Sequence, residues 1–102
     1  MFICYSGAVG LEFEWNRDKA AANISKHGVT FGEAMTVFRD PLAYTTDDVA
    51  HSADERREII IGLLPDGRLL VVGFTERLPD VIRIFSEREA TRKERRDYEE
   101  NT

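Results

Sequence analysis

The chain has 102 residues, of which 42% are hydrophobic and 32% charged, and its formal net charge is -5. This length supplies material for one hydrophobic core, which excludes a two-domain protein, and the acidic balance excludes a histone-like protein that coats nucleic acid with its whole surface. The single cysteine, Cys4, excludes an internal disulfide and a metal cage built from cysteines, so we expect a cytoplasmic protein.

Residues 1–10 carry no charged side chain. The stretch is too short to span a bilayer and lacks the basic start of a signal peptide, so we expect no contact with a membrane. We interpret residues 1–10 as an N-terminal extension: an extra strand, a frayed end, or translation from an upstream start. Residues 11–102 are then expected to form the single functional domain.

The first predicted elements are a strand and a helix. Apolar and acidic residues alternate over residues 11–15, and this period of two is typical of a strand with one buried face. Asn16 is a good N-cap for a helix that runs to about His27, where two basic residues favour the last turn and Gly28 favours a stop. The sequence therefore predicts a strand over 11–15 followed by a helix over 16–27.

A second, amphipathic helix is predicted to start at Thr30 and Glu33, which form a T-x-x-E capping box, and to end at Asp40-Pro41. After it we expect a short edge strand over 42–46 and an acidic loop over 47–55. Three strands separated by tight turns follow, over 57–64, 68–76 and 81–87. Because tight turns join antiparallel neighbours, these strands form an antiparallel sheet.

The C-terminal segment reads as a helix that opens with a second T-x-x-E box, Thr91 and Glu94. The fold class is therefore α+β: a short N-terminal strand and two helices, an antiparallel sheet of three to four strands, and a C-terminal helix. Residues 88–96 hold five bases and two acids. This modest basic patch is either a contact for a polyanion or a solvated helix with internal ion pairs.

Arginines at two strand ends are the first candidates for a functional site. Arg57 shares the strand parity of Ile61, and Arg88 shares that of Ile84 if its strand runs one residue further. At the rim of a buried face, a guanidinium keeps its stem packed and offers its planar fork to a phosphate. The alternative is that both arginines pair with neighbouring carboxylates. Arg83 is expected on the opposite face and is a weaker candidate.

Lys26 and His27 are the second pair of candidates, because both stand in the last turn of the first predicted helix. Cations there interact favourably with the helix dipole, and this structural role alone could explain them. The functional alternative uses the His27 imidazole as a general acid or base and Lys26 as a partner of a phosphate. His51 lies among acidic residues in a polar loop, so we expect it to be exposed to solvent.

Motifs for the common cofactors and metals do not occur in the sequence. It contains no metal-ligand spacing, no glycine-rich phosphate loop and no G-x-S-x-G elbow. We therefore expect no metal and no small-molecule cofactor.

Many short motifs, in this order, resemble the BrnT toxins of type II toxin-antitoxin systems. The resemblance covers about residues 12–99. In the first half the motifs are Phe13-Glu14-Trp15, Lys19-Ala20, Asn23, Lys26-His27-Gly28-Val29, Phe31, Glu33-Ala34 and Asp40-Pro41. In the second half they are Arg57, Gly62, Gly67-Arg68, Thr75-Glu76-Arg77, Arg83-Ile84-Phe85-Ser86, Arg88, Ala90-Thr91, Glu94-Arg95 and Tyr98.

The resemblance implies a RelE/ParE-like α+β toxin that acts as a metal-independent endoribonuclease and halts translation. It also implies a BrnA-like antitoxin, a dimeric DNA-binding protein, as the partner. The implied active-centre residues are Lys26, Arg57 and Arg88, with His27 and Arg83 in support. Lys19, Arg92 and Arg95 are candidates to steer the RNA backbone.

Two positions depart from the family pattern. Asn16 stands where an aspartate is usual, and as a helix cap the change is nearly neutral. Glu87 stands where a small residue is frequent, and we expect its carboxylate to weaken the local positive potential. Two other functions remain open: a toxin of the same fold that binds a protein target such as gyrase without cutting RNA, and a non-enzymatic nucleic-acid-binding or adaptor module.

Overall fold

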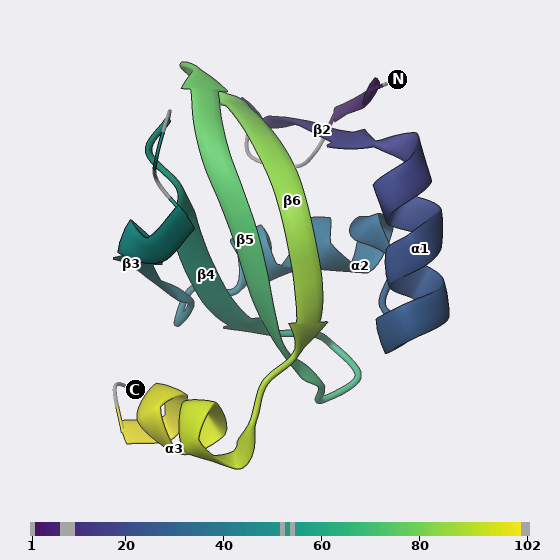
Figure 1. Ribbon diagram of the computed structural model, residues 1–102. Helices are drawn as coiled ribbons and strands as arrows, with labels where there is room; N and C mark the ends of the chain where they lie inside the picture. Colours follow the sequence, from purple (N-terminus) through teal and green to yellow (C-terminus); the bar gives the residue numbers. More distant parts are fainter. Residues whose placement is uncertain (1, 7–9, 52, 54, 101–102) are drawn as a thin grey trace.

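The computed structural model describes residues 2–6, 10–51, 53 and 55–100 (Figure 1). The predicted α+β class is confirmed, with helices around one mixed sheet. In chain order the elements are β1 (Phe2–Ser6), β2 (Glu12–Asn16), α1 (Arg17–His27), α2 (Phe31–Thr36), a 3₁₀ turn (Val37–Arg39), β3 (Tyr44–Asp47), a second 3₁₀ turn (Val49–His51), β4 (Glu58–Leu63), β5 (Leu69–Leu78), β6 (Val81–Glu89) and α3 (Arg92–Glu100).

The sheet has six strands in the order β1-β2-β6-β5-β4-β3. Strands β3 to β6 form an antiparallel meander, as the tight turns predict. β2 pairs with β6 in parallel, because the chain returns to the middle of the sheet only after both helices and three further strands. Over residues 2–6 the structure shows an added strand, which pairs antiparallel with β2. The division of the chain between residues 10 and 11 stays a prediction.

Helix α1 begins and ends where the sequence predicts. The Asn16 side chain accepts a hydrogen bond from the Lys19 N–H at 3.1 Å, and Gly28 adopts the left-handed conformation, φ 67°, that closes the helix. The capping box of Thr30 and Glu33 is also present. The second helix is shorter than predicted: the α-helix ends at Thr36, and a 3₁₀ turn continues over Val37–Arg39.

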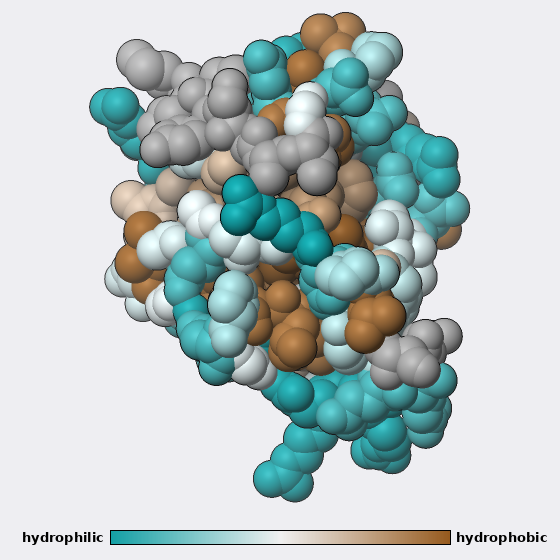
Figure 2. Space-filling view, turned by 180° about the vertical axis from the view of Figure 1, so that it is seen from behind, coloured by the Kyte–Doolittle hydropathy of each residue, from teal (hydrophilic) through white to brown (hydrophobic). Residues whose placement is uncertain are grey.

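The main hydrophobic core lies between α2 and the back of the sheet (Figure 1). The ring of Phe38 packs edge-on against both Phe13 and Phe74, with centroids 5.1 and 5.2 Å apart. Gly62 on β4 permits this packing, since a Cβ there would lie 2.6 Å from Val37 Cγ1. Seen from behind, apolar residues occupy the middle of this face, with hydrophilic residues around them (Figure 2).

A smaller apolar cluster lies on the front of the sheet and anchors α3. Tyr98 packs with Ile61 and Val71 in this cluster and stacks on Tyr44, with ring centroids 6.4 Å apart. Its hydroxyl donates a hydrogen bond to Asp40 at 2.7 Å. α3 therefore packs at the lower end of the sheet, where Tyr98 joins this cluster (Figure 1). Within the described ranges, no helix is long and apolar enough to cross a membrane.

Candidate active site

A β-bulge in β6 brings Arg88 to the front face. Gly73 pairs with Ser86 while its neighbour Phe74 pairs with Ile84, so Phe85 has no residue opposite it. The extra residue reverses which side chains of β6 face the front and which face the back. Arg88 therefore pairs with the front-face residue Val71. The sequence-based expectation that Arg88 shares the face of Ile84 is therefore wrong.

Arg57 also lies on this face. As predicted, it shares the parity of Ile59 and Ile61, which belong to the front cluster. Its guanidinium carbon stands 3.9 Å from the centre of the Phe85 ring, a cation–π contact. The unpaired bulge residue thus forms a platform that fixes the direction of the Arg57 side chain.

Around Arg57 the surface forms a hollow of about 270 Å³, which we call the Arg57 hollow. Its lining includes Lys19 from α1, Asp48 and His51 from the loop after β3, Arg57, and Phe85 and Ser86 from the bulge. Gly73 forms part of its floor, and a Cβ at that position would lie 2.8 Å from Ser86 Oγ. Lys19 and Arg57, from two separate segments, therefore face one concave surface that can hold an anion, with Asp48 and Glu58 as the acidic groups on it.

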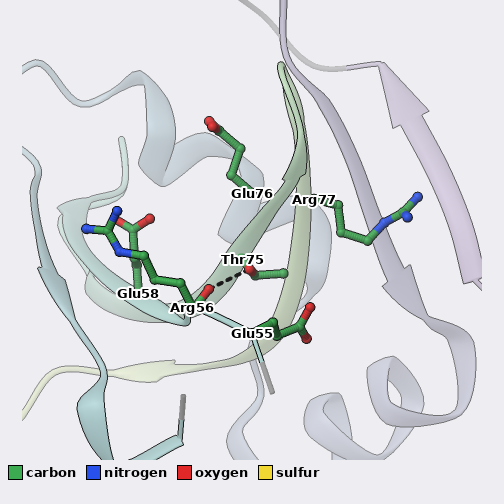
Figure 3. Close-up of a pocket in the computed structure, with 6 residues that line it drawn as sticks. All are labelled: Glu55, Arg56, Glu58, Thr75, Glu76 and Arg77. Atoms are coloured by element: carbon green, nitrogen blue, oxygen red, sulfur yellow. Dashed lines mark hydrogen bonds between the residues drawn. The ribbon is translucent and has the colours of Figure 1, made fainter. Parts of the chain in front are cut away.

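Backbone hydrogen bonds fix the segment that carries Arg57. The Asp48 N–H donates to the Arg57 carbonyl at 2.9 Å, which closes the loop between β3 and β4. The buried hydroxyl of Thr75 donates to the Arg56 carbonyl at 2.6 Å (Figure 3). The main chain at Arg56 and Arg57 is thus held from both sides, which positions the start of the Arg57 side chain.

A second hollow lies on the other side of this segment, and Figure 3 shows its lining. It has a volume of about 450 Å³ and places Arg56 and Arg77 among the carboxylates of Glu55, Glu58 and Glu76. Arg56 pairs there with Asp47 at 2.9 Å. With more acids than bases, this hollow does not fit a polyanion, which separates it from the Arg57 hollow.

Helix α1 lies beside β6 and supplies Lys19 (Figure 1). The pairing of β6 with β2 ends at Ile84, and further along this edge the Asn23 side chain on α1 donates to the Glu87 carbonyl at 2.9 Å. Lys26 follows Lys19 by two helical turns, about 10 Å along the axis. Lys26 and His27 are exposed at the end of α1, and neither lines the Arg57 hollow. The structure therefore does not bring them to Arg57.

Arg88 is engaged by α3. Its guanidinium donates to both carboxylate oxygens of Glu94, at 2.8 and 2.9 Å, and to the Glu89 carbonyl at 3.2 Å. The paired Arg88 and the Thr91 N–H hold the pKa of Glu94 down at about 2, against the opposing effect of burial. Arg88 thus pairs with a carboxylate, with Glu94 as the partner, and its role at the active centre stays a prediction.

Arg83 is engaged as well. Its Nε donates to Glu14 at 2.9 Å, and Arg77 hydrogen-bonds to the same carboxylate. Burial would raise the pKa of Glu14, but the two arginines outweigh it and hold that pKa below its ordinary value. Glu14 is buried and ionised, so this network ties β2 to the sheet.

Glu87 points away from the cationic face. It pairs with Val72 of the main core, exposes 1% of its surface, and its carboxyl oxygens have no hydrogen-bond partner among the described residues. Burial raises its pKa to about 8, so the group is mostly neutral at pH 7. The expectation that Glu87 weakens the positive potential is therefore wrong.

The remaining predicted contacts lie on α3. Arg92 and Arg95 are exposed, and Arg95 donates to the Gly67 carbonyl at 3.2 Å. Two features of the site were not predicted. Phe85 acquires its role from the bulge, and His51, although exposed as predicted, lines the Arg57 hollow and is bonded to Asp48. The sequence signals were Phe85 within the motif Arg83-Ile84-Phe85-Ser86 and a histidine shortly before Arg57.

Comparison with known proteins identifies the family. The profile of the family described as "Ribonuclease toxin, BrnT, of type II toxin-antitoxin system" matches residues 15–94. The chain belongs to the BrnT family. The crystal structure of the Brucella abortus ribonuclease toxin, BrnT, is similar to this chain, with a TM-score of 0.61 and 25% identity. The match covers 76% of this chain and 94% of the Brucella BrnT chain, and no curated protein sequence matches.

Membership of the BrnT family gives the chain its function class: it is a ribonuclease toxin of a type II toxin-antitoxin system, with an antitoxin as partner. The family match begins within β2 and ends within α3, so it includes the whole of the Arg57 hollow. The residues that line the hollow thus lie within the part of the chain that matches the family.

Proposed function

We propose that this BrnT-family chain cleaves RNA in the Arg57 hollow by a metal-independent mechanism and thereby stops translation. The observation that carries the proposal is the convergence of Arg57 and Lys19 on one concave surface. In this mechanism the 2'-hydroxyl of the RNA attacks the adjacent phosphate, and the enzyme must remove a proton and stabilise the negative charge that develops on the phosphoryl oxygens.

Arg57 is the group that stabilises this charge. Its planar fork can donate two parallel hydrogen bonds to non-bridging oxygens, and the Phe85 ring holds it in place before the substrate arrives. Lys19 adds a second positive charge from α1. A preorganised donor of this kind contributes roughly 3 kcal/mol to the transition state.

The other predicted cations are proposed to bind the RNA on either side of the reacting phosphate. Arg88 lies about 7 Å along β6 from Ser86 on the same face, and its guanidinium is half-exposed beside Glu94. Lys26 and His27 extend the surface along α1, while Arg92 and Arg95 extend it along α3. Arg83 supports the site by holding β2 through Glu14.

For the partner, we propose a BrnA-like antitoxin that binds operator DNA as a dimer and covers the Arg57 hollow in the cytoplasm. Edge strand β3 and the exposed Leu42 before it offer backbone and apolar contacts for such a cover. We assign the toxin activity to residues 11–102, with residues 1–10 as an extension. Co-expression with the product of the neighbouring gene tests the partner, because separate elution of the two proteins would contradict it.

The experiment for the activity is incubation of the purified protein with a single-stranded RNA oligonucleotide in EDTA. We expect fragments that end in a 2',3'-cyclic phosphate and begin with a 5'-hydroxyl. Intact RNA in EDTA, with cleavage restored by a divalent cation, would contradict the metal-independent mechanism. Intact RNA under all conditions, with inhibition of a protein target such as gyrase, would favour the non-nucleolytic alternative.

A further inference from the structure

Asp48 and His51 form a hydrogen-bonded pair at the rim of the Arg57 hollow. His51 Nδ1 lies 3.0 and 3.1 Å from the two carboxylate oxygens of Asp48, within one 3₁₀ turn. Both residues line the hollow. His51 and Arg57 also line another hollow, of about 340 Å³, so the two residues share the lining of both.

The pairing determines which ring nitrogen is available for chemistry. An ionised carboxylate can only accept hydrogen bonds. In the neutral ring, Nδ1 therefore carries the hydrogen and donates a hydrogen bond to Asp48. The lone pair is then on Nε2. The side chain of His51 is 68% exposed and that of Asp48 only 20%, so the imidazole can reach a ligand while the carboxylate that orients it is largely covered.

We propose that His51 is the general base of the cleavage reaction and that Asp48 is its positioning residue. This inference rests on the proposed ribonuclease site at Arg57. Nε2 of His51 takes the proton of the 2'-hydroxyl, the O2'–P bond forms, and the P–O5' bond breaks. The departing 5'-oxygen takes a proton from water, His51 returns its proton to the solvent, and a 2',3'-cyclic phosphate remains.

The surroundings of His51 suit this role better than those of the two residues at the end of α1. Lys19 and Arg57 face the same hollow and attract the phosphate, while Asp48 and Glu58 face it as the acidic groups. Glu55 lines the other hollow that His51 and Arg57 share. A phosphate held by Arg57 therefore has an imidazole within the same concave surface. Lys26 and His27, about 10 Å further along α1 than Lys19, have no comparable position.

The test uses single-turnover cleavage of an RNA oligonucleotide by His51→Ala, with exogenous imidazole as the rescue reagent. We expect the rate constant to fall by about 10²- to 10⁴-fold while RNA binding stays within about threefold, because the residue acts on the proton and not on the phosphate. Added imidazole should restore the rate at least tenfold. Asp48→Asn, which keeps the size of the side chain but removes its charge, should lower the rate constant without weakening RNA binding.

A control variant separates catalysis from structure. Val49→Ala alters the same exposed turn without a titratable group, so it should cleave at close to the wild-type rate. A His51→Ala protein that cleaves within threefold of wild type, or whose lost activity imidazole does not restore, overturns the role of His51 alone. Wild-type protein that leaves the RNA intact overturns the proposed function, and this inference with it.

Discussion

The buried carboxyl of Glu87 predicts that this protein loses stability as the pH rises from 5 to 8. Burial raises its pKa from 4.5 to about 8. Between these two values the folded chain binds the proton more tightly than the unfolded chain, so the free energy of unfolding falls with increasing pH. At about 1.4 kcal/mol per pH unit, the loss between pH 5 and pH 8 amounts to roughly 3 kcal/mol.

Glu87→Gln tests this reasoning, because the amide has nearly the shape of the protonated carboxyl but does not ionise. At pH 5 we expect the variant and the wild type to unfold with free energies within about 1 kcal/mol of each other. At pH 8 the variant should be more stable by about 3 kcal/mol, which corresponds to a melting temperature at least 10 °C higher for a domain of roughly this size.

The assay is urea unfolding followed by circular dichroism at pH 5, 7 and 8. Glu89→Gln is the matched control, since Glu89 ends the same strand but is exposed. Its unfolding free energy should change with pH in parallel with that of the wild type. If Glu87→Gln also runs parallel to the wild type, the Glu87 carboxylate is not confined in the core, and the argument from burial is refuted.

Two further predictions concern packing and the α3 ion pair. Gly62→Ala should lower the unfolding free energy by about 1 to 3 kcal/mol in urea titrations, because the added Cβ would lie 2.6 Å from Val37 Cγ1. A variant as stable as the wild type would show instead that the 3₁₀ turn that carries Val37 can move. Glu94→Gln should lower the unfolding free energy by about 1 to 2 kcal/mol at pH 7, where the paired carboxylate contributes, since Arg88 is half-exposed. The difference in unfolding free energy should disappear as the pH falls from 4.5 through about 2, because folded Glu94 takes up its proton at a pKa of about 2. A difference that persists at pH 1.5 would contradict the ion pair of Glu94 with Arg88 as its cause.

The elements could be predicted from the sequence because their signals are local. Alternation over residues 11–15, the Asn16 cap and the two T-x-x-E boxes each depend on a few neighbouring side chains, and each is present in the structure. The parallel pairing of β2 with β6 could not be predicted this way. It joins segments far apart in the chain, and periodicity does not encode which strands become neighbours.

The site was predictable only in part. Arg57 was placed on the correct face because β4 alternates without interruption, whereas Arg88 was misplaced because one bulge residue, Phe85, inverts the alternation after it. The same bulge turns Glu87 into the main core, which is why its carboxylate does not act on the positive potential as expected. The approach of His51 to Arg57 depends on how the loop after β3 folds back, and a polar loop sequence carries little information about that path.

The rate of RNA cleavage by Arg57→Ala, compared with Arg56→Ala, tests the Arg57 hollow most directly as the reaction centre. The two arginines are neighbours in the chain, but Arg57 contacts Phe85 in the hollow and Arg56 pairs with Asp47 outside it. With an RNA oligonucleotide in EDTA, and with circular dichroism as a check of folding, the account predicts a loss of about 10²- to 10³-fold for Arg57→Ala and a near wild-type rate for Arg56→Ala. Equal rates for the two folded variants would contradict it.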